Sequence, residues 1–154
     1  MVETWNQGRA TVDQLMAENK IEAVPPNLEA AVDLIAKAHT HLRSAALLAD
    51  SDTELAFDAL HAANRKALTA VLLVQGLRPT REGGHTSVFE AVRAQVDPPL
   101  GATLLPYSRI RRTRNAGDYL TALPPDAADV HAELPSCEAI VSMAQVLITK
   151  LPPY

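Results

Sequence analysis

The 154-residue chain contains little cysteine and no long apolar run. Cys137 is its only cysteine, which excludes an intramolecular disulfide and a metal site built on several thiolates. The longest apolar run covers residues 67–74, far short of the roughly 20 residues that a membrane-spanning helix needs. The N-terminal segment is interrupted by charges and lacks a secretory pattern. We therefore expect a cytoplasmic protein with no membrane contact.

Aromatic residues are also scarce, at 4% of the chain, whereas alanine is the commonest residue. This composition favours closely packed helices, because sheets rely on aromatic and β-branched side chains. The length fits one domain over residues 1–154. Short connections predict antiparallel neighbours, so we expect an all-α antiparallel bundle of five or six helices. A net charge of −4 gives the whole chain no electrostatic attraction to nucleic acid.

Prolines and capping residues indicate where each helix begins and ends. Pro25 and Pro26 end the first element, Asn27 caps the second, and Gly76 ends the third. Residues 77–84 read as a loop. The expected helices cover residues 1–23, 27–49, 52–76, 85 or 86–96, 103 or 108–122, and 126–151.

The stretch RIRRTRNAGDY, which we call the basic stretch (residues 109–119), carries four arginines within six positions. On a helix it forms two adjoining stripes, namely Arg112, Asn115 and Tyr119, and Arg111, Arg114 and Asp118. Arginines three positions apart repel one another, so something must compensate for their charge. Two interpretations stay open. Acids of neighbouring helices pair with the arginines at a solvated face, or the stretch binds an anion such as phosphate.

Three short motifs make the chain recognisable. GLRP at 76–79, GGH at 83–85 and R-N-x-x-x-Y at 114–119 follow one another in an order that resembles the HEPN superfamily of helical-bundle proteins. The resemblance is strongest over residues 52–122 and general elsewhere. It implies a homodimer that acts as a toxin or defence-associated protein, binding RNA or cleaving it as a metal-independent endoribonuclease.

The resemblance also implies roles for individual residues. Arg114 matches the family's arginine and Asn115 its polar neighbour, while Arg109, Arg111 and Arg112 would hold phosphate; Arg112 is also an alternative for the catalytic arginine. Tyr119 stands where those members carry histidine. Because tyrosine has a reference pKa of about 10, it is a poor base near neutral pH. We therefore expect a site that binds RNA and cleaves it weakly or not at all.

A noncatalytic alternative uses the same residues. The arginines would dock an acidic partner such as a nucleotidyltransferase-like antitoxin, and Tyr119 would be the residue that the partner modifies. A neighbouring gene for such a partner would favour the toxin interpretation.

Histidines offer few further sites. His61 shares a helical face with Asp58 and Arg65, so it is either a polar edge of the bundle or an accessory group, like Asp118, in the cleft of the basic stretch. His39 and His41 are two positions apart and would point to different sides of a helix, which makes them a poor metal pair. Residues 83–85 lack the spacing and lysine of a P-loop and read as a tight loop. We expect no metal and no cofactor.

Overall fold

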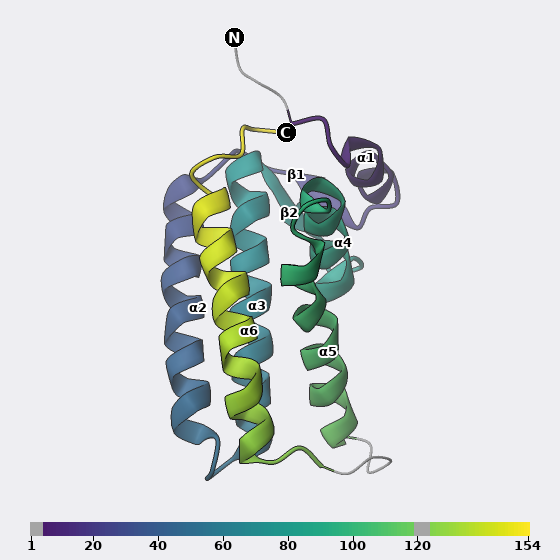
Figure 1. The fold of residues 1–154 in the computed structure, drawn as a ribbon. Coiled ribbons are helices and arrows are strands. Elements are labelled where there is room, and N and C mark those ends of the chain that lie inside the picture. The colour runs from purple at the N-terminus through teal and green to yellow at the C-terminus, as the bar shows by residue number, and fades with distance from the viewer. Residues whose placement is uncertain (1–4, 119–123) are drawn as a thin grey trace.

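The computed structural model describes residues 5–118 and 124–154, without the side chains of His85 and residues 116–118. Its framework is four long helices, α2 (Leu28–Leu48), α3 (Thr53–Gln75), α5 (Gly101–Asp118) and α6 (Ala127–Leu147). In Figure 1 these helices run alternately down and up, side by side. The expected all-α antiparallel bundle is confirmed.

Helix α3 lies at the centre of the bundle. It packs against α2, α5 and α6 and against the shorter α4 (Gly84–Val96). In Figure 1, α2 and α5 lie on opposite sides of it. Its fully buried alanines are Ala56, Ala63, Ala67 and Ala70. Because small side chains let helix backbones approach closely, this composition explains how one helix can contact four neighbours.

The buried face of α2 follows the spacing of a coiled coil. Ala31, Ile35, Ala38, Leu42 and Ala45 are buried, at alternating intervals of four and three positions. Such spacing keeps one seam of the helix against its neighbours along its full length. This face confirms the predicted apolar stripe of the second helix.

Capping residues set the helix ends at the predicted places. The side chain of Asn27 accepts a hydrogen bond from the Ala30 amide at 2.9 Å, and that of Asp52 from the Leu55 amide at 3.0 Å. Asp126 forms a reciprocal capping box at the start of α6. These bonds satisfy amides that have no partner inside the helix.

The prediction of one helix over residues 1–23 is wrong, because this part of the chain forms a short helix and a strand. Helix α1 (Arg9–Ala17) is short, and β1 (Ile21–Ala23) pairs antiparallel with β2 (Leu77–Pro79), where only a loop was expected. Asn19 has a φ of 59°, a left-handed conformation that ends the helical path. Strands of three residues are too short to show alternating hydrophobicity, so sequence patterns did not reveal them.

The fifth helix begins earlier than expected, at Gly101 instead of Thr103 or Ser108. Pro106 lies inside α5, where its ring removes a helical hydrogen bond. The sequence signal for the start of the helix was therefore ambiguous. The fourth helix begins at Gly84, one or two residues before its expected start at His85 or Thr86.

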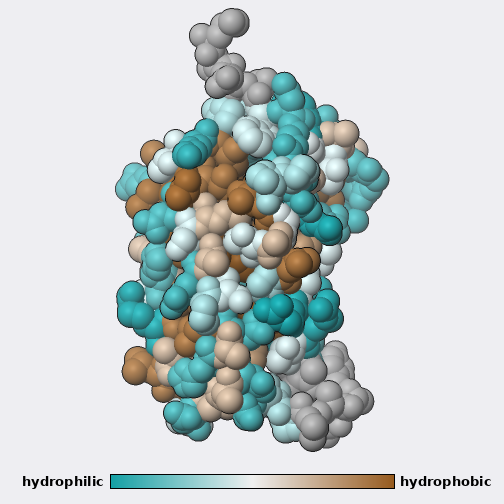
Figure 2. All heavy atoms as spheres, viewed as in Figure 1, coloured by the Kyte–Doolittle hydropathy of each residue, from teal (hydrophilic) through white to brown (hydrophobic). Residues whose placement is uncertain are grey.

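The surface mixes hydrophilic and hydrophobic residues. Figure 2 shows a largely hydrophilic face with hydrophobic residues gathered towards its upper end. The large exposed apolar residues are Leu28, Val32, Leu47, Leu55, Leu105 and Val146. They are spread over four helices, and the expected homodimer stays a prediction. Among the described residues, no helix combines the length and apolar character that crossing a membrane requires.

Candidate functional site

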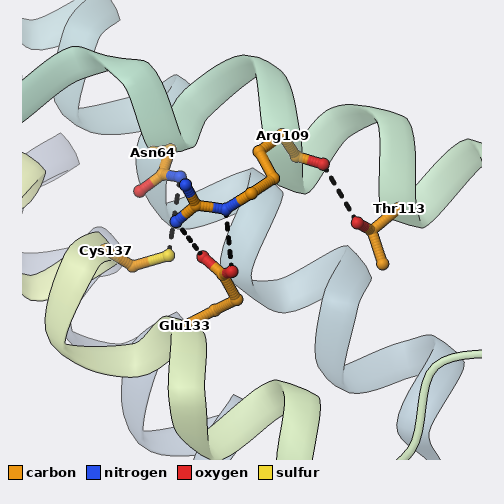
Figure 3. A network of polar contacts seen from close by, with 5 residues as sticks. All are labelled: Asn64, Arg109, Thr113, Glu133 and Cys137. Carbon is orange, nitrogen blue, oxygen red and sulfur yellow. Dashed lines mark hydrogen bonds and ion pairs between the residues drawn. The ribbon is translucent and has the colours of Figure 1, made fainter.

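Arg109, the first arginine of the basic stretch, is engaged within the fold. Its Nε and Nη2 atoms donate hydrogen bonds to Oε1 and Oε2 of Glu133 at 2.8 and 2.7 Å, which joins α5 to α6 (Figure 3). The hydrogen bond to Glu133 raises the pKa of Arg109 further above its usual value. At this position the structure favours the interpretation in which an acid of a neighbouring helix compensates the charge.

A buried pair lies next to this ion pair, as Figure 3 shows. The Asn64 side-chain amide donates to Sγ of Cys137 at 3.6 Å, and both residues are fully buried. Burial raises the pKa of the Cys137 thiol to about 12, although the Asn64 hydrogen bond acts in the opposite direction. Cys137 is therefore protonated at neutral pH and is not an activated nucleophile.

Arg114 pairs with an acid through a single atom. Its Nε donates to Oδ1 of Asp58 at 2.6 Å, which links α5 to α3. Both side chains are partly exposed, at 36% and 48%. Among the described contacts only Nε of Arg114 is engaged, so the two terminal nitrogens of the guanidinium are available to a ligand.

The remaining two arginines of the stretch have no acidic partner among the side chains that the structure describes. Arg111 and Arg112 are exposed, and neither forms an ion pair with a side chain that the structure describes. Arg111 lies one turn from Arg114, and Asp58 offsets only one of these two charges. The basic stretch therefore keeps a net positive charge at the surface of α5.

Arg111 and Arg114 line a pocket of about 390 Å³ between α5 and the start of α4. The lining residues are Arg111, Arg114 and Asn115 from α5, and Gly83, Gly84 and Thr86 from the α4 side. Guanidinium and side-chain amide donors thus face the same space as the N-terminal end of a helix. This combination of charges and donors suits an anion.

Glycines explain why α4 can begin at this place. A Cβ atom on Gly83 would lie 2.1 Å from the carbonyl oxygen of Lys20, so only glycine fits there. Gly84 has a φ of +54°, which glycine adopts without strain. Thr80 holds the turn, because its Oγ1 accepts from the Gly83 amide at 3.2 Å and its carbonyl oxygen from the Gly84 amide at 3.1 Å.

The first turn of α4 can itself receive an anion. Thr80 already accepts from the amides of Gly83 and Gly84, but no acidic residue lies in this turn. The helix dipole also places partial positive charge at this end of α4. Both features favour phosphate or another anion in the pocket.

Tyr107 fixes α5 against α3 and α4, and so positions the pocket. It is 1% exposed, stacks on Phe89 with ring centroids 5.1 Å apart, and meets the His61 ring at 5.5 Å. Burial raises the pKa of Tyr107 to about 12, whereas the charges of Arg65 and Arg111 act to lower it. The two arginines therefore lie near the same phenol, one on α3 and one on α5.

Of the two predicted accessory residues, His61 and Asp118, the structure describes the side chain of His61 only. His61 is 2% exposed and does not line the pocket, while Asp58, one turn earlier on α3, contacts Arg114. The structure therefore brings Asp58 to the basic stretch and leaves His61 in the core. Tyr119 lies outside the described residues, and so does the side chain of Asp118.

His39 and His41 of α2 point to different sides of the helix, as predicted, and contact different neighbouring helices. His39 forms a hydrogen bond with Gln145 of α6, and His41 forms one with Lys66 of α3. Within residues 5–118 and 124–154, no three His, Cys, Asp or Glu side chains gather in a way that could hold a metal ion.

Comparison with known proteins identifies no relative. No protein-family model, no curated protein and no solved structure matches the chain. The resemblance to the HEPN superfamily therefore rests on the three sequence motifs alone and stays a prediction.

The Arg109–Glu133 pair yields a stability prediction. Arg109→Ala is expected to lower the free energy of unfolding by about 1 kcal/mol, because a bidentate ion pair that is partly exposed contributes only modestly to stability. Urea titrations of Arg109→Ala, Glu133→Gln and the double variant would give the coupling energy between the two side chains. Arg112→Ala, which removes an exposed arginine that has no ion pair with a described side chain, is the control and should leave stability unchanged. A coupling energy of zero would contradict the pairing.

Proposed function

We propose that this protein binds RNA through the pocket between α4 and α5, as a HEPN-like toxin or defence-associated protein. One observation carries the proposal. Arg111, Arg114 and Asn115 face the same space as the first turn of α4, in which no acidic residue lies. The sequence resemblance supports RNA as the source of the phosphate, because it implies RNA-directed proteins with this arginine and asparagine.

Each lining residue has a distinct role in the proposed site. Arg111 supplies a charge that no described acid neutralises, and its planar guanidinium matches two phosphate oxygens at once. Arg114 supplies its terminal nitrogens, while Asp58 holds Nε and so orients the side chain. Asn115 can donate to phosphate or accept from a ribose hydroxyl.

The acidic character of the whole chain does not exclude this proposal. Charges are screened over about 8–10 Å at physiological salt, so the local arginines matter more to a bound phosphate than the overall charge of −4 does. Binding should therefore weaken steeply as salt rises.

A titration with fluorescently labelled single-stranded RNA tests the proposal. Arg111→Ala is expected to weaken binding about tenfold, because a charge-assisted hydrogen bond contributes about 1.5 kcal/mol or more. Arg43→Ala is the matched control, since Arg43 is exposed on α2, contacts Thr40, and carries the same charge. Equal affinities of Arg111→Ala and Arg43→Ala would refute the pocket as the RNA site, and would redirect the question to an acidic protein partner.

Cleavage is the second part of the proposal and needs a proton acceptor at the same phosphate. The resemblance places Tyr119 there, and its reference pKa of about 10 predicts weak cleavage or none at neutral pH. RNA should be incubated, with metal chelated, with wild type, Arg114→Ala and Tyr119→Phe. Fragments that form with wild type and vanish with Arg114→Ala would establish a ribonuclease. Intact RNA throughout would establish that the pocket only binds.

A further inference from the structure

The outward face of α3 continues the positive charge of the pocket. Arg65 and Lys66 are half-buried on this face, together with Ala62 and Thr69. Neither basic residue forms an ion pair with a side chain in the described part of the chain. Two adjacent cations thus lie on the central helix, and no acid in the described part of the chain pairs with them.

Arg65 lies on the face of α3 that also carries Asp58, the residue that contacts Arg114. It lies seven positions after Asp58, so the two residues share one face of the helix, about 10 Å apart along its axis. Asp58 contacts Arg114, and Arg65 lies near Tyr107, as Arg111 does. Arg65 therefore adds a positive charge to this face of α3, about two turns beyond Asp58 and towards the same phenol as Arg111.

Lys66 adds a positive charge on the side of α3 that faces α2. Its Nζ lies within hydrogen-bonding distance of Nε2 of His41. Burial lowers the pKa of His41, and the charges of Lys66 and Arg65 lower it further, so His41 is neutral at neutral pH and accepts the bond. The contact holds Lys66 in place and leaves its charge intact.

We infer that the RNA ligand is an extended single strand that runs from the pocket across α3, with its phosphates contacting Arg65 and then Lys66. This inference rests on the proposed function and extends the same site. This basic band, made of Arg111 and Arg114 on α5 and of Arg65 and Lys66 on α3, crosses one helix spacing of about 8–10 Å and extends about 10 Å along the axis of α3. Several consecutive phosphates are needed to cover that span, and a single nucleotide cannot.

Binding of RNAs of two lengths distinguishes contacts with the basic band from contacts with the pocket alone. A dinucleotide with a 5′-phosphate probes the pocket alone, and an oligonucleotide of about ten residues probes the whole band. Wild type should bind the longer RNA more tightly. Arg65→Gln and Lys66→Gln should each weaken binding of the longer RNA about fivefold to tenfold and leave dinucleotide binding unchanged, whereas Arg111→Ala should weaken both. Circular dichroism would verify that each variant is folded, with Arg43→Gln as the matched control.

The outcomes distinguish the two claims. If Arg65→Gln and Lys66→Gln bind the longer RNA as wild type does, while Arg111→Ala weakens both ligands, the band is overturned and the pocket stands. If wild type binds neither RNA, the proposed function fails and the band fails with it.

Discussion

Raising the pH from 9 to 12 is expected to remove several kcal/mol from the free energy of unfolding. Two buried groups cause the loss. The pKa of Cys137 rises from 9.0 to about 12, and that of Tyr107 rises from 10.0 to about 12, in both cases mainly through burial. One unit of pKa shift corresponds to about 1.4 kcal/mol, so each group contributes on the order of a few kcal/mol.

The sign of this effect follows from which state releases its protons first. Below about pH 8 both groups are protonated in the folded and the unfolded chain, and the stability they confer is complete. Above the unfolded pKa values, the unfolded chain ionises while the folded core still holds the neutral thiol and phenol. Stability therefore falls with rising pH until the folded values near 12 are reached.

Urea titrations at pH 8 and at pH 11 would measure the loss. Cys137→Ala is the informative variant, because it removes one of the two groups and should lessen the decrease between the two pH values, whatever its effect on stability at pH 8. A free energy of unfolding that is the same at both pH values would contradict the burial of these groups.

Replacing Asp58 by Asn is expected to tighten RNA binding about threefold to tenfold. Asp58 places a negative charge beside the pocket, since its Oδ1 lies 2.6 Å from Nε of Arg114. Asn keeps an oxygen that can accept from Nε and so preserves the orientation of Arg114, but it removes the charge that repels phosphate. The exposure of both partners limits the effect, because water screens their charges.

Glu54→Gln provides the matched control for this prediction. Glu54 is an exposed acid on the same helix, it forms no ion pair with a described side chain, and its replacement changes the net charge equally. An RNA titration should show tighter binding only for Asp58→Asn. Equal affinities of the two variants would show that overall charge, and not the contact with Arg114, controls binding.

Much of the fold could be predicted, because the signals that determine it are local. The alternation of alanine with larger residues on α2, and the capping residues Asn27, Asp52 and Asp126, lie within a few positions of the elements they define. The pairing of β1 with β2 depends on contacts between distant segments, and three-residue strands carry no periodic signal. The start of α5 was obscured by Pro106.

The candidate site was predictable only in part, for the same reason. The arginines and Asn115 are evident from their clustering at 109–119. Their division into paired and unpaired groups depends on Asp58, 56 positions before Arg114, and on Glu133, 24 positions after Arg109. The part played by Gly83 depends on a close approach to Lys20 that no local pattern records.

The salt dependence of RNA binding tests the central claim most directly. Each phosphate contact with a single strand contributes about 0.7 to the slope of log affinity against log salt. The double variant Arg111→Ala with Arg114→Ala should therefore show a slope about 1.4 shallower than wild type, and weaker binding at every salt concentration. A slope equal to that of wild type would contradict the account, because the two arginines would then make no contact with RNA phosphates.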